Sequence, residues 1–390
     1  IRVDHLLLEA MSRFGHQRNV YLIAGWVPTT KVDDLLKRLR WVTQGRISAE
    51  VTKPKRADAI GRVPVALGNP KPLRFFQQLV TNYGWPNYGE LDPTPLMALT
   101  FPLIFGIMFG DVGHGLLLAL LGLLLVSRKV RALRGLSGLG AVVIACGVTA
   151  MIFGFLYGSA FGSEEILEPL WIRPLQDVMD ILLAAVGIGV GLLNLGMICN
   201  LVNAVLTRRW GYLLFDHNGL AGMIFYWSLL GLVAGAFVEG LPIGPIPLAA
   251  LAAVSGLAVT FSEVLEHLVE GRRPLVEGGL GSYLVQTPIE LFEVVISFLS
   301  NTLSYVRMGA FAVAHGALSM VVFIVAEIIS PTHGVGYWIV VVLGNLFVVG
   351  FEGMVVSIQT LRLEYYEFFS KFFSGGGVRY RPLTLVPREK

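Results

Sequence analysis

The sequence has few charged residues and only two cysteines, and both features exclude broad classes of protein. Of its 390 residues, 15% are charged and 54% are hydrophobic, and the net charge of +3 is too small to favour nucleic acid as a partner. The mean hydropathy of +0.67 excludes an ordinary soluble protein. Cys146 and Cys199 lie in apolar runs, so we expect buried small side chains rather than a disulfide or metal pair.

The sequence also lacks a glycine-rich phosphate-binding loop, a signal peptide and an initiating methionine. Without such a loop, the chain is not expected to carry out ATP chemistry itself. We expect no bound cofactor and no metal. Because the chain starts at Ile1, we expect it to be the later part of a longer polypeptide.

Long apolar runs fill the chain after residue 90 and predict an all-α polytopic membrane domain over residues 91–373. The eight predicted transmembrane helices are 94–110, 113–126, 136–161, 175–206, 218–238, 246–269, 288–329 and 334–373. The last two are long. At ~1.5 Å per residue the seventh measures about 60 Å, twice a hydrocarbon core of ~30 Å, so we expect it to be tilted.

Residues 1–90 are soluble in character and predict a small α+β fragment and linker, with a strand over 19–27 and helices over 31–41 and 73–83. Residues 374–390 form a basic tail. Basic residues gather in the linkers of one side: Arg128, Lys129, Arg131, Arg134, Arg208, Arg209, Arg272, Arg273, Lys371, Arg379 and Arg381. The opposite side carries only Arg173, so the positive-inside rule predicts cytoplasmic N- and C-termini.

A single basic residue, Arg307, lies in the middle of the seventh predicted span. A charge there costs roughly 2.5–3.5 kcal/mol on insertion scales, so we expect it to have a function. The polar residues that precede it recur at helical spacing on one face: Glu290, Glu293, Ser297, Ser300 and Ser304. The alternative is a structural ion pair that holds two helices together. A snorkelling side chain is disfavoured, because Arg307 is far from either interface.

A second polar stripe follows the eighth span through Asn345, Glu352, Gln359 and Arg362. In the predicted topology, Glu290, Glu293 and Ser297 lie on the cytoplasmic side of Arg307. Arg362, Glu364 and Glu367 lie on the cytoplasmic side of Glu352 in the eighth span. A second set of titratable residues lies toward the outside: Asp111, His114, His315 and Glu352. Two sets of titratable groups separated by arginine predict two offset proton half-channels, each ending at a barrier.

Each of these residues also has a structural interpretation. Glu290 lies near a helix start, where it would interact with the helix dipole. His315 would make a hydrogen bond between helices, and Arg362 would pair with a neighbour such as Glu364. Asp111 and His114 would shape a tight hairpin together with nearby glycines.

Three stretches, residues 95–115, 303–319 and 352–373, resemble the first hairpin and the seventh and eighth helices of one family. The family is subunit a, also called subunit I, of the V-type and archaeal-type rotary ATPases. With Gly25-Trp26-Val27-Pro28, the resemblance covers essentially the whole chain. It implies a stator subunit in a prokaryotic plasma membrane, beside a rotating ring of proteolipid c subunits. Its N-terminal domain would contact peripheral stalks, the central stalk and the V1 (A1) sector, which would carry the ATP chemistry.

The resemblance also implies roles for single residues. Arg307 would be essential for proton translocation and Arg362 would support it. Glu293 and Ser297 would line the cytoplasmic half-channel, and Asp111, His315 and Glu352 the outer one. The competing interpretation is a secondary cation/proton antiporter, but the two halves of the chain show no self-similarity. A passive channel is disfavoured because a buried arginine opposes cation passage.

Overall fold

The protein is described from a computed structural model. Its described residues are 11–12, 14–18, 20–54, 63–127, 129–163, 166–237, 244–271 and 280–382. The chain divides into two compact units. The smaller unit comprises Ile1–Gly68, Gly84–Gly89 and Gly375–Lys390, and the larger comprises Asn69–Tyr83 and Glu90–Ser374.

The described part of the smaller unit includes short strands and the amphipathic helix α2. Strands β1 (Gly15–Gln17) and β2 (Val20–Leu22) pair antiparallel. The 3₁₀ turn η1 (Thr29–Lys31) leads into helix α2 (Val32–Val42), which agrees with the helix predicted over 31–41. The strand predicted over 19–27 is shorter than expected, since residues 23–28 are irregular. Strand β3 (Pro64–Val65) pairs in parallel with β4 (Val378–Arg379).

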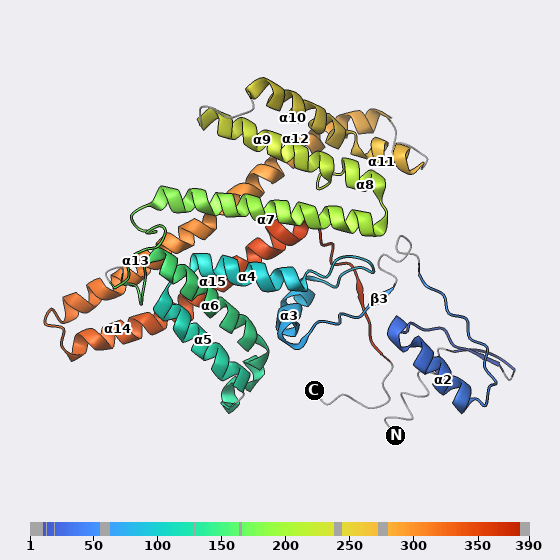
Figure 1. Ribbon diagram of the computed structural model, residues 1–390, viewed down its shortest axis with the longest axis horizontal. Helices are drawn as coiled ribbons and strands as arrows, with labels where there is room; N and C mark the ends of the chain where they lie inside the picture. Colours follow the sequence, from blue (N-terminus) through green and yellow to red (C-terminus); the bar gives the residue numbers. More distant parts are fainter. Residues whose placement is uncertain are drawn as a thin grey trace. The chain divides into compact units, whose positions relative to one another are not determined.

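The larger unit begins with helices that pack through glycine. Its first elements are η3 (Lys71–Leu73), α3 (Arg74–Tyr83), α4 (Thr94–Met108), α5 (Val112–Ser127), η4 (Arg131–Leu139) and α6 (Gly140–Tyr157). Helix α6 packs against both α4 and α5 (Figure 1). A Cβ atom at Gly115 would lie 2.7 Å from the Gly147 carbonyl oxygen. Small residues at such a contact let apolar helices approach closely where burial from water supplies no driving force.

The middle of the larger unit is a long helix followed by two helix pairs. These elements are α7 (Val178–Thr207), α8 (Trp210–Phe215), α9 (Leu220–Phe237), α10 (Pro245–Thr260) and α11 (Ser262–Glu270). Helix α9 packs against α10, and α8 packs against α11 (Figure 1). The chain bends by 68° between α10 and α11, at Phe261.

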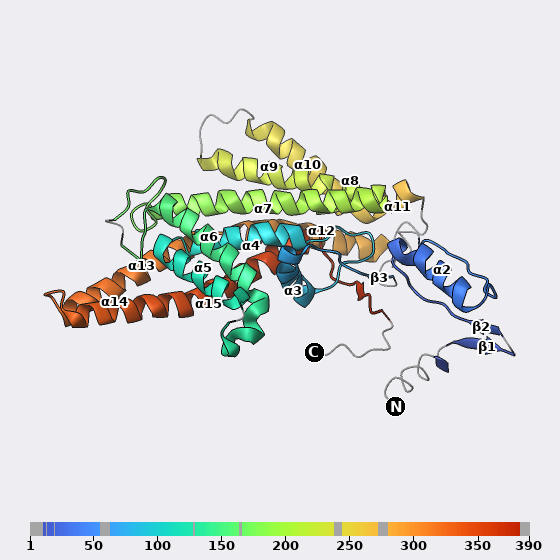
Figure 2. The ribbon, with the colours of Figure 1, turned by 60° about the horizontal axis from the view of Figure 1, so that its bottom comes forward.

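The C-terminal part consists of the two long helices that the sequence predicts. Helices α12 (Leu280–Ser304) and α13 (Val306–Ile329) are separated only by Tyr305. The second long helix comprises α14 (Val335–Phe347), η5 (Val348–Glu352), α15 (Gly353–Arg362), η6 (Leu363–Phe368) and η7 (Phe369–Lys371). Segments η5 and η6 are π-helical, a form that is frequent at functional sites. Helices α13 and α14 lie side by side in both views (Figures 1 and 2).

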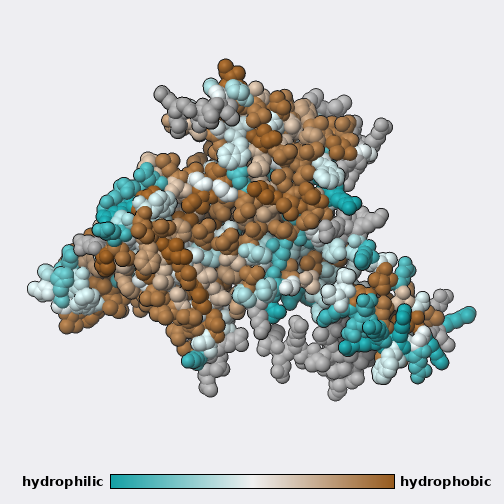
Figure 3. Space-filling view, in the orientation of Figure 1, coloured by the Kyte–Doolittle hydropathy of each residue, from teal (hydrophilic) through white to brown (hydrophobic). Residues whose placement is uncertain are grey.

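The chain is a mostly helical membrane protein. Among the described residues, five helices are long and apolar enough to cross a bilayer: Gly135–Tyr157, Val178–Thr207, Trp210–Phe237, Gln286–Ile329 and Val335–Lys371. The bent pair α10–α11 makes a sixth candidate, and α4 and α5 are shorter apolar helices. Hydrophobic residues cover the visible face over α5, α6, α7 and α9, while hydrophilic residues gather at the loop after α6 (Figure 3). The sequence predicts eight transmembrane helices, and this higher count stays a prediction.

Candidate functional site

The turn between α4 and α5 is built around a buried carboxylate. Asp111 is 0% exposed and accepts four hydrogen bonds. Its Oδ1 accepts from the backbone N–H groups of His114 (2.8 Å) and Phe161 (2.9 Å). Its Oδ2 accepts from the Ser159 hydroxyl (2.7 Å) and the Gly162 N–H (2.8 Å). Asp111 therefore caps α5 and ties the turn to the loop that follows α6.

The side chain of His114 lies between two oxygen atoms. Its Nδ1 lies 3.4 Å from Asp111 Oδ1, and its Nε2 lies 2.6 Å from Asn345 Oδ1 on α14. The Asn345 amide nitrogen donates to the Val341 carbonyl at 2.7 Å. The amide oxygen of Asn345 is therefore the atom that faces His114, and His114 Nε2 carries the hydrogen of this contact.

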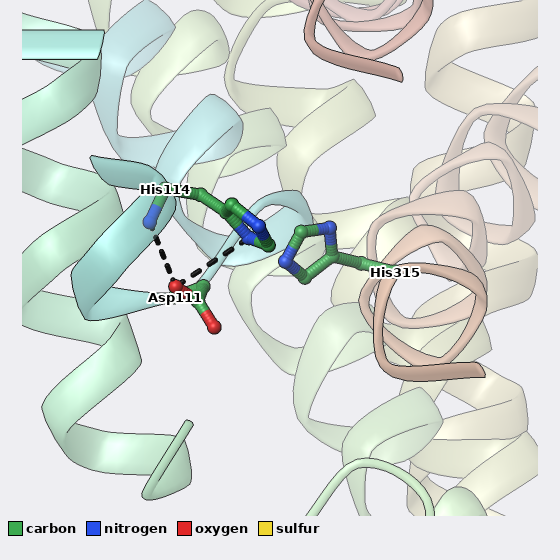
Figure 4. A group of neighbouring side chains, drawn as sticks. All are labelled: Asp111, His114 and His315. Atoms are coloured by element: carbon green, nitrogen blue, oxygen red, sulfur yellow. Dashed lines mark hydrogen bonds and ion pairs between the residues drawn. The ribbon is translucent and has the colours of Figure 1, made fainter. Parts of the chain in front are cut away.

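A second buried pair joins α13 to η5. The Nδ1 atom of His315 lies 2.9 Å from Glu352 Oε2, and the two residues are 3% and 6% exposed. The centroids of the His114 and His315 rings are 5.3 Å apart, and the centroid of the Phe109 ring lies 4.5 Å from that of His315. Figure 4 shows one nitrogen of the His315 ring turned toward His114 and Asp111.

The structure thus brings together all four residues that the sequence assigns to the outer side. We call them the outer cluster, together with Asn345: Asp111, His114, His315, Asn345 and Glu352. Asn345 belongs to the predicted stripe of the eighth span but was not predicted as a site residue. The loop donors Ser159, Phe161 and Gly162 were missed, because they bind Asp111 through two backbone N–H groups and one hydroxyl. The glycine-rich character of this loop was the available signal.

Arg307 lies apart from the outer cluster, in the first turn of α13. Its side chain is half-buried, and Nη1 is buried without a hydrogen-bond partner. Its charged neighbours are Arg362 and Glu367. Within the described part of the chain, Arg307 forms no ion pair at 4.0 Å or less. The structural ion pair considered from the sequence is therefore not found among these residues.

The residues predicted for the cytoplasmic side lie along the surface of α12. Glu290 and Glu293 are exposed and Ser297 is half-buried. Farther along the same helix lies an open surface patch formed by Ile296, Leu299, Ser300, Leu303 and Ser304. On the other long helix, Gln359 is half-buried and Arg362 is exposed. These residues do not gather into a cluster as the outer residues do.

Three buried charged residues near the end of the last helix were not predicted as site residues. Glu364 is 0% exposed, and neither carboxylate oxygen accepts a hydrogen bond of normal geometry. Glu367 and Lys371 are 5% and 6% exposed, and Lys371 Nζ lies 5.2 Å from the centre of the Phe298 ring. Buried charges inside an apolar helix are costly, so they mark this segment as a second candidate region.

Comparison with known proteins shows what the chain is similar to. Residues 5–167 and 271–385 match the V-type ATPase 116kDa subunit family. An A-type ATP synthase subunit I from Thermococcus kodakarensis is 28% identical over 385 residues, which cover 93% of this chain and 54% of the relative. A protein of the same name from Methanocaldococcus jannaschii is 28% identical over 401 residues, covering 96% of this chain and 56% of the relative.

A bacterial relative gives a shorter match. The V-type ATP synthase subunit I 2 from Treponema pallidum is 36% identical over 217 residues, which cover 49% of this chain and 48% of that protein. The chain spans about half the length of the curated relatives it matches.

Proposed function

The chain belongs to the V-type ATPase 116kDa subunit family, and from this premise we propose that it is the stator subunit of a rotary ATPase or ATP synthase. In this proposal it forms two proton half-channels beside a ring of proteolipid c subunits and couples proton movement to rotation of the ring. One observation carries the proposal. It is the buried pair of His315 and Glu352, which lies beside the His114 ring, with His315 on the same helix α13 as Arg307 and farther along it.

The proposed topology has eight crossings. Residues 1–90 and 374–390 lie in the cytoplasm of a prokaryotic cell, and residues 91–373 form the domain in the plasma membrane. Six apolar spans, counting the bent pair, together with α4 and α5 supply the eight segments that this count requires. The bias of basic residues toward one set of linkers supports this orientation.

The proposed outer half-channel is the outer cluster. A histidine and a glutamate in hydrogen-bond contact can pass a proton, because the imidazole ring can accept a proton at one nitrogen and release one from the other. Glu352 holds the His315 ring through Nδ1 and leaves Nε2 facing His114. Asp111 already accepts four hydrogen bonds, so its role in this path is to keep His114 in position.

The proposed barrier is Arg307. A ring carboxylate that meets an arginine at ~4 Å, with an effective dielectric constant near 20, gains about 4 kcal/mol, or roughly three pKa units. Such a carboxylate loses its proton at the arginine and regains one beyond it. The half-buried Arg307 forms no ion pair among the described residues, which leaves its charge available to a partner. The exposed Arg362 would support it.

The proposed cytoplasmic half-channel runs along α12 and ends near Arg307. Glu290, Glu293 and Ser297 supply its polar groups, and Gln359 contributes from α15. The surface patch on α12 combines exposed leucines with Ser300 and Ser304. This mixed surface suits contact with the proteolipid ring. Peripheral stalks, the central stalk and the V1 (A1) sector are the partners proposed for the cytoplasmic part.

The first test replaces Arg307 and measures proton pumping by the reconstituted complex. Arg307→Gln should abolish coupled transport while the complex still assembles, because the barrier charge is gone. Arg307→Lys should restore little, because an ammonium does not reproduce the planar fork of a guanidinium. Arg362→Gln should weaken pumping, and Arg173→Gln, in a loop, is the matched control with normal transport. Normal pumping by Arg307→Gln would show that the half-channel proposal is wrong.

A further inference from the structure

The outer cluster leaves two ring nitrogens without a hydrogen bond. The Nε2 atom of His114 contacts Asn345, and the Nδ1 atom of His315 contacts Glu352. The other nitrogen of each ring, Nδ1 of His114 and Nε2 of His315, is buried and has no hydrogen-bond partner. The centroids of the two rings that carry these nitrogens are 5.3 Å apart.

The hydrogen bonds of the two rings determine which ring nitrogen carries a hydrogen and which carries a free electron pair. The Asn345 oxygen and the Glu352 carboxylate are acceptors, so the ring nitrogens that face them carry the hydrogens. In the neutral rings, His114 Nδ1 and His315 Nε2 therefore present bare electron pairs. His114 Nδ1 also faces the Asp111 carboxylate oxygen at 3.4 Å.

Two bare ring nitrogens thus converge beside the charge of the Asp111 carboxylate, whose oxygens already accept four hydrogen bonds. One ligand atom from each of Asp111, His114 and His315 lies within 4.8 Å of the other two, and all three residues are buried (Figure 4). Such groups repel one another unless a metal ion or an added proton lies among them. Two ligands on one tetrahedral zinc ion, with bonds of about 2.0–2.1 Å, are separated by about 3.4 Å. The separation of Asp111 Oδ1 and His114 Nδ1 is 3.4 Å, so this pair is already spaced for a shared ion.

We propose that the outer cluster binds a divalent transition-metal ion, such as Zn²⁺, through Asp111, His114 and His315. Imidazole nitrogens suit zinc, copper or nickel, whereas magnesium and calcium prefer all-oxygen sites. The hydrogen bonds made by the other nitrogen of each ring also suit a metal site. Each histidine donates its remaining ring N–H to an oxygen, from Asn345 or Glu352, which is the usual arrangement of metal-bound histidine.

The fourth position of a tetrahedral site is open to water or to the hydroxyl of Ser319. Ser319 lies one helical turn beyond His315, is 2% exposed, and its oxygen has no hydrogen-bond partner. Gly162 donates its N–H to Asp111 and lies against Ser319. A Cβ atom at position 162 would clash with the Ser319 side chain. The site therefore contains one more unused oxygen close to its ligands.

Metal binding does not depend on the proposed function, but its consequence does. An ion on His315 Nε2 occupies the electron pair that would accept a proton. If the cluster is the outer half-channel, the bound ion should inhibit transport, and it should act from the outer face of the membrane.

The binding test uses the purified membrane complex with the full-length protein, without a polyhistidine tag and stripped with a chelator. Zn²⁺ is measured by equilibrium dialysis, and Co²⁺ by its visible absorption as a tetrahedral complex. We expect one ion bound by the wild type and lost in His315→Gln. Asn345→Leu, which removes only a second contact, should bind 10–100-fold more weakly. His333→Gln changes an exposed histidine in the turn before α14 and should bind like the wild type.

Two results would overturn the site. If His315→Gln and the wild type bind equal amounts of Zn²⁺, the ion lies elsewhere. If the wild type binds none, the cluster holds a proton only. The melting temperature of each variant without metal checks its fold, and a rise on adding Zn²⁺ should appear in the wild type but not in His315→Gln. Arg307→Gln separates the two proposals, because it should lose pumping and still bind Zn²⁺.

Discussion

At the scale of single residues, the effect of replacing Glu352 or His315 depends on whether the other is still present. Both are buried, and one hydrogen bond of 2.9 Å joins them. Removing one partner leaves a buried polar group without a hydrogen bond, which costs about 1–3 kcal/mol, whereas removing both leaves none. The two substitutions should therefore not act independently.

A double-mutant cycle tests this coupling. Glu352→Ala and His315→Ala should each lower the melting temperature of the complex and reduce proton pumping. The double variant should lose less stability than the sum of the two single losses, because no unpaired group remains. Glu327→Ala, at an exposed glutamate on α13, is the matched control and should leave both quantities unchanged. Strictly additive losses would contradict a direct interaction.

The sequence could predict which residues matter at this scale but not their contacts. A charge or a histidine inside an apolar run is visible in the sequence, so Asp111, His114, His315 and Glu352 were found and assigned to one side. Their contacts depend on how distant helices pack, and no local pattern encodes that. The unused nitrogens of the two histidines follow from Asn345 and Glu352, so a metal site could not be predicted from spacing. The sequence likewise shows Glu364 as a charged residue, but it does not show that its buried carboxylate oxygens accept no hydrogen bond of normal geometry.

At the scale of secondary-structure elements, the last helix departs from regular spacing. The predicted stripe assumes one helical period from Asn345 to Arg362, but η5 is π-helical and follows Asn345 within the same helix. Asn345 and Glu352 are buried, Gln359 is half-buried and Arg362 is exposed. A π-turn has more residues than an α-turn and changes which side the following residues face. The long helix was therefore predictable from its apolar length, but its internal irregularities were not.

The packing of α5 on α6 gives a prediction at the same scale. A Cβ atom at Gly147 would lie 2.5 Å from the backbone nitrogen of Ala119, so the backbone itself must move to accept a side chain. Gly147→Val should separate the two helices and displace His114, which lies on α5. We expect a clear drop in melting temperature, of the size that overpacking by 1–3 kcal/mol produces, and reduced pumping.

The control for this substitution is a glycine of α7 with free space around it. Apart from its chain neighbours and the backbone of its own helix, no atom lies within 4 Å of a Cβ built at Gly191, so Gly191→Ala should change neither the melting temperature nor pumping. Equal melting temperatures for Gly147→Val and Gly191→Ala would show that the α5–α6 contact is looser than the structure indicates.

At the scale of the whole molecule, composition alone predicts a membrane protein, and the long apolar helices agree with it. The predicted orientation depends on charge counts in the linkers, and packing cannot test it because it is the same in either orientation. The chain itself allows a direct measurement. Its only cysteines, Cys146 and Cys199, are both buried, so a new cysteine on the surface would be the main target of a thiol reagent.

Labelling of intact cells with a membrane-impermeant maleimide therefore tests the topology. Glu168→Cys, in the loop after α6, and Thr332→Cys, in the turn between α13 and α14, are exposed positions predicted to face outward. Both should be labelled on intact cells. Gly135→Cys, in η4, and Arg381→Cys, after β4, should react only once the membrane is opened, because the basic linkers stay in the cytoplasm. Labelling of Gly135→Cys from outside would invert the first hairpin and place the outer cluster on the cytoplasmic side, and the assignment of the two half-channels would then have to be exchanged.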